Sequence, residues 1–217
     1  MSNFDLIVFD WDGTLMDSAT AIVEAIQASC RDLGLPVPST ARARHVIGLG
    51  LAEALQHAVP DLPEHAYPRM SERYRHHYLA GDHTLRLFTG VEAMLADLRA
   101  RGFAIAVATG KSRAGLARAM AHFDLGAFFH ATRTADQCRS KPHPQMLEEL
   151  MEELGSTPER TLMIGDTTHD LQMAKNAGVP GIGVSYGAHP EQELRALSPL
   201  ACMPTVAALA EWLRQNA

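Results

Sequence analysis

The sequence predicts an α/β fold: a doubly wound, Rossmann-like parallel sheet with an all-helical segment inserted near its amino-terminal end. Short apolar runs alternate with longer amphipathic stretches, which is typical of βαβ units in a parallel sheet. This alternation is interrupted once, between residues 17 and 86. The length of 217 residues is too great for one simple sheet and too small for two independent domains, so a core domain with an insertion fits best.

The expected strands are apolar runs that end at small or polar residues. In chain order they are 6–9, 104–108, a weaker run at 127–132, 161–164 and 181–185. The helices expected outside the insertion are 91–101, 113–123, 144–154, 170–177 and 206–214, and several are followed by the glycine that often caps a helix end. Helices that connect parallel strands cross over in the right-handed sense, which predicts an open sheet covered on its faces.

The interrupted stretch, 17–86, contains no convincing strand. Apolar residues at helical spacing, such as Ile22 and Ile26, and similar patterns at 52–59 and 67–78 predict several helices. Arg and His residues are concentrated here, in a chain whose net charge is −6. A basic insert over an acidic core suggests an anionic ligand between them, although most of these arginines are expected on solvated helix faces. We therefore expect a core domain of residues 1–16 and 87–217 and a helical domain of residues 17–86.

Composition excludes several classes of protein. Apolar residues make up 47% of the chain and charged residues 20%, which predicts a globular protein with a sizeable core. A mildly acidic chain lacks the basic surface that binds nucleic acid. Cys30, Cys138 and Cys202 form no CxxC pair, which favours a reducing compartment. The apolar run at 6–9 is too short for a signal sequence or a membrane span. We expect a cytoplasmic monomer or homodimer with no nucleic-acid or membrane partner.

Polar residues follow three of the expected strands at their carboxyl ends, where open parallel sheets bind ligands. Asp10 and Asp12 follow the first strand, Thr109 the second, and Asp166 and Asp170 a later one. Four carboxylates in one crevice need either raised pKa values or a bound cation. Mg²⁺ prefers such oxygen ligands and commonly takes a phosphate as a further ligand. The pattern predicts a site for Mg²⁺ and a phosphorylated molecule.

Three further groups fit a phosphate site. Lys141 lies in a segment stiffened by two prolines and can offset charge on a phosphoryl group. The Thr109 hydroxyl and the backbone N–H of Gly110 can donate hydrogen bonds to phosphoryl oxygens. Lys141, Thr109 and Gly110 are therefore candidate phosphate-binding residues.

Two nucleotide motifs are excluded by counting. Residues 110–112 read as the end of a Walker A loop, but Ile105 stands where that motif needs its first glycine. Residues 48–50 begin like a dinucleotide fingerprint, but Glu53 stands where the third glycine is needed. His169 has no partner at metal-ligand spacing and is expected to be a loop residue.

Four motifs occur in a characteristic order: DWDGTL at 10–15, TG at 109–110, KP at 141–142 and GDTTHD at 165–170. In this order they match the motifs of the haloacid dehalogenase-like (HAD) hydrolases, which the chain resembles. The helical insert resembles the cap of the subfamily that contains phosphoglycolate phosphatases and β-phosphoglucomutases. Trp11 replaces the Leu, Met or Phe that is common there, and we expect its side chain to point away from the site.

The resemblance implies a role for each motif residue. Asp10 resembles the nucleophile, which is ionised at its ordinary pKa of about 3.9 and forms an aspartyl-phosphate. Asp12 resembles the general acid and base, with its backbone carbonyl on the metal. Asp166 resembles the second metal carboxylate, and Asp170 a residue that fixes a metal-bound water. The implied metal residues are thus Asp10, Asp12, Asp166 and Asp170, with Thr109 and Lys141 on the phosphoryl group.

The implied activity is Mg²⁺-dependent hydrolysis of a small phosphorylated metabolite. The loop at 42–50 resembles the specificity loop of phosphoglycolate phosphatases, and Arg44 or His45 in it can bind a substrate carboxylate, so 2-phosphoglycolate is the expected substrate. Two enzymatic alternatives stay open: β-phosphoglucomutase-like phosphoryl transfer, disfavoured because residues 19–26 lack an HxxAW-type segment, and hydrolysis of sugar phosphates or pyrophosphate. The non-enzymatic alternatives are a receiver-like domain and a degenerate phosphate-binding protein on the same fold.

Overall fold

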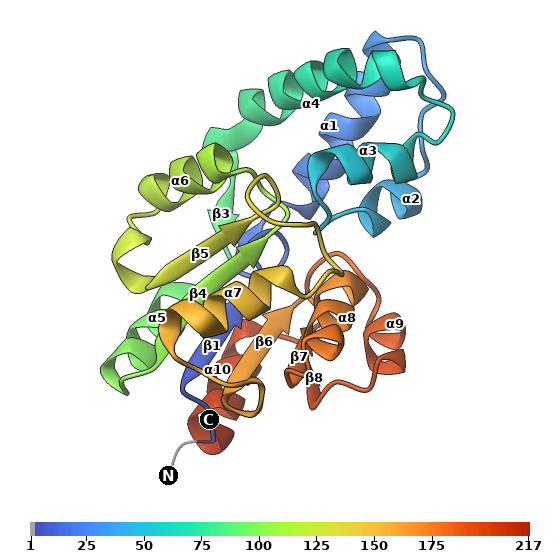
Figure 1. The fold of residues 1–217 in the computed structure, drawn as a ribbon. Coiled ribbons are helices and arrows are strands. Elements are labelled where there is room, and N and C mark those ends of the chain that lie inside the picture. Colours follow the sequence, from blue (N-terminus) through green and yellow to red (C-terminus); the bar gives the residue numbers. More distant parts are fainter. Residues whose placement is uncertain (1–2) are drawn as a thin grey trace.

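The computed structural model describes residues 3–217 and contains the expected parallel sheet with helices around it (Figure 1). The strands of this sheet are β1 (Leu6–Phe9), β4 (Ala104–Thr109), β5 (Ala131–Thr134), β6 (Thr161–Gly165), β7 (Gly181–Val184) and β8 (Ala201–Met203). Their spatial order is β5-β4-β1-β6-β7-β8, and each neighbouring pair is parallel. Because the order runs outward from β1 in both directions, the predicted doubly wound α/β fold is confirmed.

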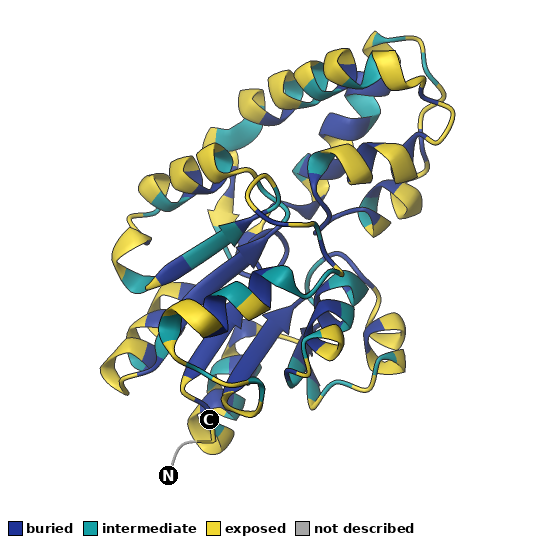
Figure 2. Ribbon diagram, in the orientation of Figure 1, coloured by how far each residue is buried: buried dark blue, intermediate teal, exposed yellow. Residues whose placement is uncertain are grey.

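Helices cover both faces of the sheet. They are α5 (Val91–Ala100), α6 (Arg113–His122), α7 (Gln145–Leu154), α8 (Thr168–Asn176), α9 (Glu191–Ala196) and α10 (Val206–Asn216). Successive side chains of a strand point to opposite faces. In β1, Leu6 and Val8 therefore pack with α7 and α8, whereas Ile7 and Phe9 pack in the opposite layer with α5 and α10. Burial on both faces explains why the strands read as unbroken apolar runs (Figure 2).

Three local predictions were wrong. The weak run at 127–132 is a strand only from residue 131, since residues 126–128 form a short 3₁₀ helix. Strand β8 and helix α9 were not expected, because three and six residues are too few to show a periodic pattern. His169 lies in the first turn of α8 and not in a loop.

The inserted segment is helical, with two short strands at its ends. Its helices are α1 (Ala19–Asp32), α2 (Thr40–His45), α3 (Leu51–Ala58) and α4 (Tyr67–Gly81), with 3₁₀ turns at 64–66 and 82–84; another such turn, at 158–160, precedes β6 in the core. Strands β2 (Met16–Asp17) and β3 (Arg86–Leu87) pair antiparallel where the chain enters and leaves the segment. This ribbon corrects the expectation that residues 17–86 contain no strand.

The helical segment lies beyond the carboxyl ends of the sheet strands (Figure 1). Helix α1 packs along α4, and the faces that meet are buried while the outward faces are exposed (Figure 2). The helical segment therefore covers the edge of the sheet at which the motif residues are expected. No helix among residues 3–217 is long and apolar enough to cross a membrane.

Candidate active site

Three of the four predicted carboxylates meet at the carboxyl end of the sheet. Asp10 follows β1, Asp166 follows β6, and Asp170 lies in the first turn of α8. One carboxylate oxygen from each lies within 4.8 Å of the other two, and all three side chains are fully buried. Neighbouring parallel strands that end at one edge therefore bring together residues more than 150 positions apart.

Asp166 is held rigidly by its neighbours. The Thr14 hydroxyl donates to Asp166 Oδ1 at 2.9 Å, and the backbone N–H of Ala188 donates to Oδ2 at 2.7 Å. Gly13 has a positive φ of 81°, and a Cβ at that position would lie 2.1 Å from Asp166 Oδ2. Glycine at position 13 therefore allows both the turn and the close approach of this carboxylate.

Asp170 is fixed by the start of its own helix. Thr167 caps α8, and its backbone N–H and hydroxyl donate to Asp170 Oδ2 at 3.0 and 2.6 Å. This capping box satisfies Oδ2 and leaves Oδ1 directed at the other charged groups. Capping and site geometry thus depend on the same two residues.

Lys141 is the cation that pairs with two of these carboxylates. Its side chain is fully buried, and Nζ lies 2.7 Å from Asp10 Oδ1 and 2.6 Å from Asp170 Oδ1. These contacts have ion-pair distances without the directional geometry of hydrogen bonds. Burial lowers the pKa of Lys141, but the two carboxylates outweigh that effect and hold the pKa above its ordinary value. Lys141 is therefore charged at neutral pH, as its predicted role on a phosphoryl group requires.

One lysine does not neutralise three carboxylates. Burial raises the pKa of Asp10 to about 7, a rise that Lys141 opposes and Asp170 reinforces. Burial also raises the pKa of Asp166, with Asp10 and Asp170 adding repulsion. Asp10 Oδ2 is buried without a hydrogen-bond partner among the described residues. A hard divalent cation such as Mg²⁺ fits this donor set, because it supplies the missing positive charge and prefers carboxylate oxygens.

Asp12 lies apart from this cluster. Its carboxylate accepts a hydrogen bond from Ser18 Oγ at 2.6 Å and contacts Lys111 Nζ at 2.9 Å through both oxygens. Lys111 Nζ also donates to the hydroxyl of Tyr78, on helix α4, at 3.0 Å. The Asp12 side chain is therefore held by a core lysine that also contacts the helical segment.

Lys111 was not predicted as a site residue. In the sequence it was considered only as the lysine of a false Walker A loop. The available signal was its position, directly after Thr109 and Gly110 at the carboxyl end of β4. Residues at that edge of a parallel sheet face the ligand site.

Thr109 and Gly110 lie where the helical segment meets the core. Thr109 is buried, and its hydroxyl accepts a hydrogen bond from the backbone N–H of Lys111 at 3.2 Å. A Cβ at Gly110 would lie 2.4 Å from the carbonyl oxygen of Leu49 and 2.5 Å from that of Gly48. The loop before α3 is thus in direct backbone contact with Gly110, which only glycine permits.

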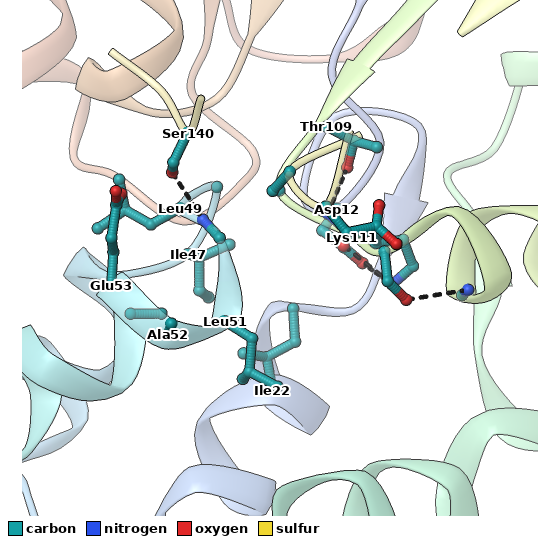
Figure 3. Close-up of a pocket in the computed structure, with 18 of the residues that line it drawn as sticks. Asp12, Ile22, Ile47, Leu49, Leu51, Ala52, Glu53, Thr109, Lys111 and Ser140 are labelled. Atoms are coloured by element: carbon teal, nitrogen blue, oxygen red, sulfur yellow. Dashed lines mark hydrogen bonds and ion pairs between the residues drawn. The ribbon is translucent and has the colours of Figure 1, made fainter. Parts of the chain in front are cut away.

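A cavity of about 610 Å³ lies between the helical segment and the core. Asp10, Asp12, Thr109, Gly110 and Lys111 line its core side. Figure 3 shows Asp12, Thr109 and Lys111 on one side of this cavity, with residues of the loop before α3 opposite. Trp11 does not line it; its ring is buried and packs near Phe129 at a centroid distance of 6.1 Å.

Arg44 and His45 do not line this cavity. Arg44 donates from Nη2 to the carbonyl of Gly187 at 3.0 Å, in the loop after β7. The ring of His45 stacks on His189 at a centroid distance of 4.7 Å, and its carbonyl accepts from the ring of His169 at 2.8 Å. Both residues thus join the helical segment to the core outside the cavity lining, and their predicted contact with a substrate carboxylate stays a prediction.

Known proteins that resemble this chain in sequence include phosphatases, in agreement with the site geometry described above. The model of the family described as haloacid dehalogenase-like hydrolase matches residues 7–184. The chain is 37% identical to the probable phosphatase IndB of Dickeya dadantii, over 92% of this chain and 89% of that protein. It is 31% identical to a 5'-nucleotidase of Pseudomonas aeruginosa, over 97% and 96% of the two chains. It is 32% identical to a phosphoglycolate phosphatase of Vibrio cholerae, over 86% and 87%.

Among solved structures, a predicted phosphoglycolate phosphatase from Haemophilus somnus superimposes with a TM-score of 0.87 at 26% identity, over 97% of this chain and 98% of that one. A predicted phosphatase from Clostridium acetobutylicum has the same TM-score and identity, over 99% and 100%. Motif order, strand order, the buried carboxylate cluster and these similarities agree, and the chain belongs to the haloacid dehalogenase-like hydrolases.

Proposed function

We propose that this hydrolase is a Mg²⁺-dependent phosphomonoesterase that works through an aspartyl-phosphate on Asp10. The observation that carries the proposal is the group of three buried carboxylates, two of them paired with Lys141, from which Asp10 reaches a cavity large enough for a small organic phosphate. Asp10, Asp166 and Asp170 would hold Mg²⁺ together with the backbone carbonyl of Asp12. When bound, the cation offsets charge on the carboxylates and on the phosphoryl oxygens.

The chain's own groups can carry each step. Asp10 attacks phosphorus and forms a P–O bond while the bond to the leaving alcohol breaks. Asp12 gives a proton to that alcohol and then takes one from the water that hydrolyses the aspartyl-phosphate. Lys141 and the Thr109 hydroxyl stabilise the charge on the transferring phosphoryl oxygens. Phosphate and a free alcohol are the products, and Asp10 is regenerated.

In this proposal residues 17–86 act as a cap and residues 1–16 and 87–217 as the catalytic core. The cavity supports the division, since the core supplies its catalytic side and the helical segment supplies the rest. The relatives are named for different substrates, a 5'-nucleotidase and phosphoglycolate phosphatases among them, so similarity to the family does not by itself identify the alcohol. The expectation of 2-phosphoglycolate depended on the resemblance of the 42–50 segment and on Arg44 or His45, neither of which lines the cavity.

Phosphate release from p-nitrophenyl phosphate tests the proposed activity. We expect turnover with Mg²⁺, loss of turnover in EDTA, and recovery when Mg²⁺ is restored. A transfer of the phosphoryl group to a sugar phosphate faster than to water would instead favour a mutase. Absence of any release would favour a phosphate-binding protein without hydrolase activity.

The contact between Lys111 and Asp12 gives a prediction about turnover. Replacing Lys111 with Met removes a charge-assisted hydrogen bond worth about 1.5–3 kcal/mol, so we expect kcat to fall roughly 10- to 100-fold. Lys111→Arg should recover part of this loss, since it keeps a cation near Asp12. Steady-state kinetics with p-nitrophenyl phosphate measure kcat and KM separately. An unchanged kcat in Lys111→Met would show that Asp12 does not need this partner.

The raised carboxyl pKa values predict how Mg²⁺ stabilises the protein at different pH. The pKa of Asp10 rises from 3.8 when unfolded to about 7 when folded, and that of Asp166 also rises. At a pH between the unfolded and folded pKa values of Asp10, the metal-free folded state binds more protons than the unfolded state. The stability of the metal-free protein therefore falls as pH rises through this range. Mg²⁺ needs the ionised carboxylates, so it should stabilise more at pH 8 than at pH 5.5.

At a concentration of about 100 times its Kd at pH 8, Mg²⁺ should raise the melting temperature at that pH by roughly 5–10 °C. The same Mg²⁺ concentration at pH 5.5 should give less than half of this rise. Thermal melts at both pH values, with and without Mg²⁺, measure the difference. Asp166→Asn is the control, and it should lose most of the rise at pH 8; an equal rise at both pH values would contradict the assignment.

A further inference from the structure

The cavity is large for the expected two-carbon substrate. Its volume of about 610 Å³ lies inside the range of about 300–1,000 Å³ that is typical of sites for drug-sized ligands. A phosphoryl group at Asp10 would leave most of that space to the alcohol part of the substrate. A two-carbon alcohol such as glycolate fills little of it, so most of the wall would contact only water.

The buried part of the wall beyond the catalytic residues is mainly apolar, whereas the charged residues that also line the cavity are all exposed: Glu53, Arg75, Arg118, Asp136 and Arg139. The apolar part is formed by side chains from α1, from α3 with its preceding loop, and from α4: Ile22, Ile26, Ile47, Leu49, Leu51, Tyr74 and Tyr78. Figure 3 shows Ile22, Ile47 and Leu51 grouped on the side of the helical segment, across from Asp12 and Lys111. An apolar wall gains free energy when it contacts apolar ligand surface and gains little from a hydrated ligand.

Polar groups next to the catalytic end already have partners. Lys111 Nζ contacts Asp12 and the Tyr78 hydroxyl. The Ser140 hydroxyl accepts a hydrogen bond from the backbone N–H of Gly50 at 2.8 Å. A sugar hydroxyl placed beside these two groups would give up its water without gaining a free partner, and a carboxylate placed beside Asp12 would have to draw Lys111 away from it.

The ring of Tyr78 already contacts a cation and a second ring, and the other five residues of this apolar part besides Tyr74 are aliphatic. The ring of Tyr78 has Lys111 Nζ above it at 4.8 Å and stacks with Tyr74 at a centroid distance of 5.8 Å. Contact with the substrate therefore falls mainly to the aliphatic side chains. Such contacts depend on apolar area and not on the electronic character of a ring, so an alkyl or an arylalkyl group satisfies them equally.

We propose that the cavity binds phosphomonoesters whose alcohol is bulky and largely apolar, and that it disfavours 2-phosphoglycolate and sugar phosphates. This inference rests on the proposed phosphomonoesterase activity. It concerns only the alcohol part, since the phosphoryl group is bound by core residues. The substrate class is an alkyl or arylalkyl monophosphate.

Three substrates that all release a primary alcohol test the proposal with similar leaving-group reactivity. They are 2-phenylethyl phosphate, 2-phosphoglycolate and glucose 6-phosphate, with p-nitrophenyl phosphate as a reporter of phosphatase activity itself. We expect kcat/KM for 2-phenylethyl phosphate to exceed that for each of the other two alcohol esters by about tenfold or more, as burial of the phenyl group implies. If p-nitrophenyl phosphate is hydrolysed but kcat/KM for 2-phenylethyl phosphate is equal to or below that for the other two esters, this inference alone is overturned. No release from any of the four overturns the proposed activity and the inference with it.

A pair of variants tests whether the apolar wall causes the preference. Ile22→Asn places an amide on the wall and should reduce the ratio of kcat/KM for 2-phenylethyl phosphate to that for 2-phosphoglycolate about tenfold. Val37→Asn makes the same kind of change at a residue of the helical segment that is 45% exposed and does not line the cavity, so it should leave the ratio as in the wild type. Should Ile22→Asn fold poorly, the conservative Ile22→Ala is measured by the same ratio, with the same direction expected. An unchanged ratio in a folded Ile22 variant overturns the inference.

Discussion

Asp10→Asn is expected to abolish phosphate release, with kcat lower by roughly 10⁴-fold or more. An amide has nearly the same shape as a carboxylate but lacks the charged oxygen that attacks phosphorus. Lys141 keeps its second partner, Asp170, at 2.6 Å, so the buried cation is not left alone. Release of phosphate from p-nitrophenyl phosphate at saturating Mg²⁺ measures the effect.

Two controls separate loss of chemistry from loss of fold. Asp61→Asn makes the same substitution at an exposed residue and should keep wild-type turnover. Circular dichroism and thermal melts should show Asp10→Asn to be folded. Acid-quenched wild-type enzyme should carry a phosphoryl group that hydroxylamine removes, and the variant should carry none. Turnover near the wild-type level in Asp10→Asn would refute the assignment of Asp10 as nucleophile.

The parts of the fold that the sequence predicts are those encoded in local patterns. Strands β1, β4 and β6 lie in the middle of the sheet and are buried on both faces, so their apolar runs stand out from the flanking polar residues. Strand β8 lies at an edge, has three residues and alternates in burial, which leaves no run to detect. The short ribbon of β2 and β3 forms through a pairing between residues far apart in the chain, and no local pattern specifies it.

The same distinction applies to the site. Asp10 and Asp166 directly follow strands, Asp170 lies in the first helical turn after β6, and the geometry of parallel strands brings such residues to one edge. The contact of Lys111 with Asp12 and Tyr78 joins residues 99 and 33 positions apart, across the boundary between core and helical segment. Residue type and spacing placed the segment 42–50 near the site, but its first four residues, Arg44 among them, belong to helix α2. Residue type and spacing did not show which way the side chain of Arg44 turns, because the turn depends on the carbonyls of a loop more than 140 positions later.

Lys141→Met is expected to weaken both the fold and the chemistry. The substitution leaves Asp10 and Asp170 buried without their shared cation, and breaking a buried ion pair in this way costs about 3–5 kcal/mol. Urea unfolding in EDTA at pH 8 measures the lower free energy of unfolding. At pH 5 the loss should be smaller, because Asp10, with its raised pKa, can take up a proton and shed its charge. With saturating Mg²⁺ the variant should fold but turn over roughly 100-fold or more slowly, since the charge that stabilises the phosphoryl oxygens is gone.

The chain supplies a matched control for this change in Lys175, one of only three lysines in the sequence. Lys175 is exposed near the end of α8, so Lys175→Met should alter neither the free energy of unfolding by more than about 0.5 kcal/mol nor kcat. A loss in Lys141→Met that is equal at pH 5 and pH 8 would mean that the destabilisation comes from packing and not from unpaired carboxylates. A folded Lys141→Met enzyme with wild-type kcat would mean that the charge of this lysine, although paired with Asp10 and Asp170, does not act on the phosphoryl group.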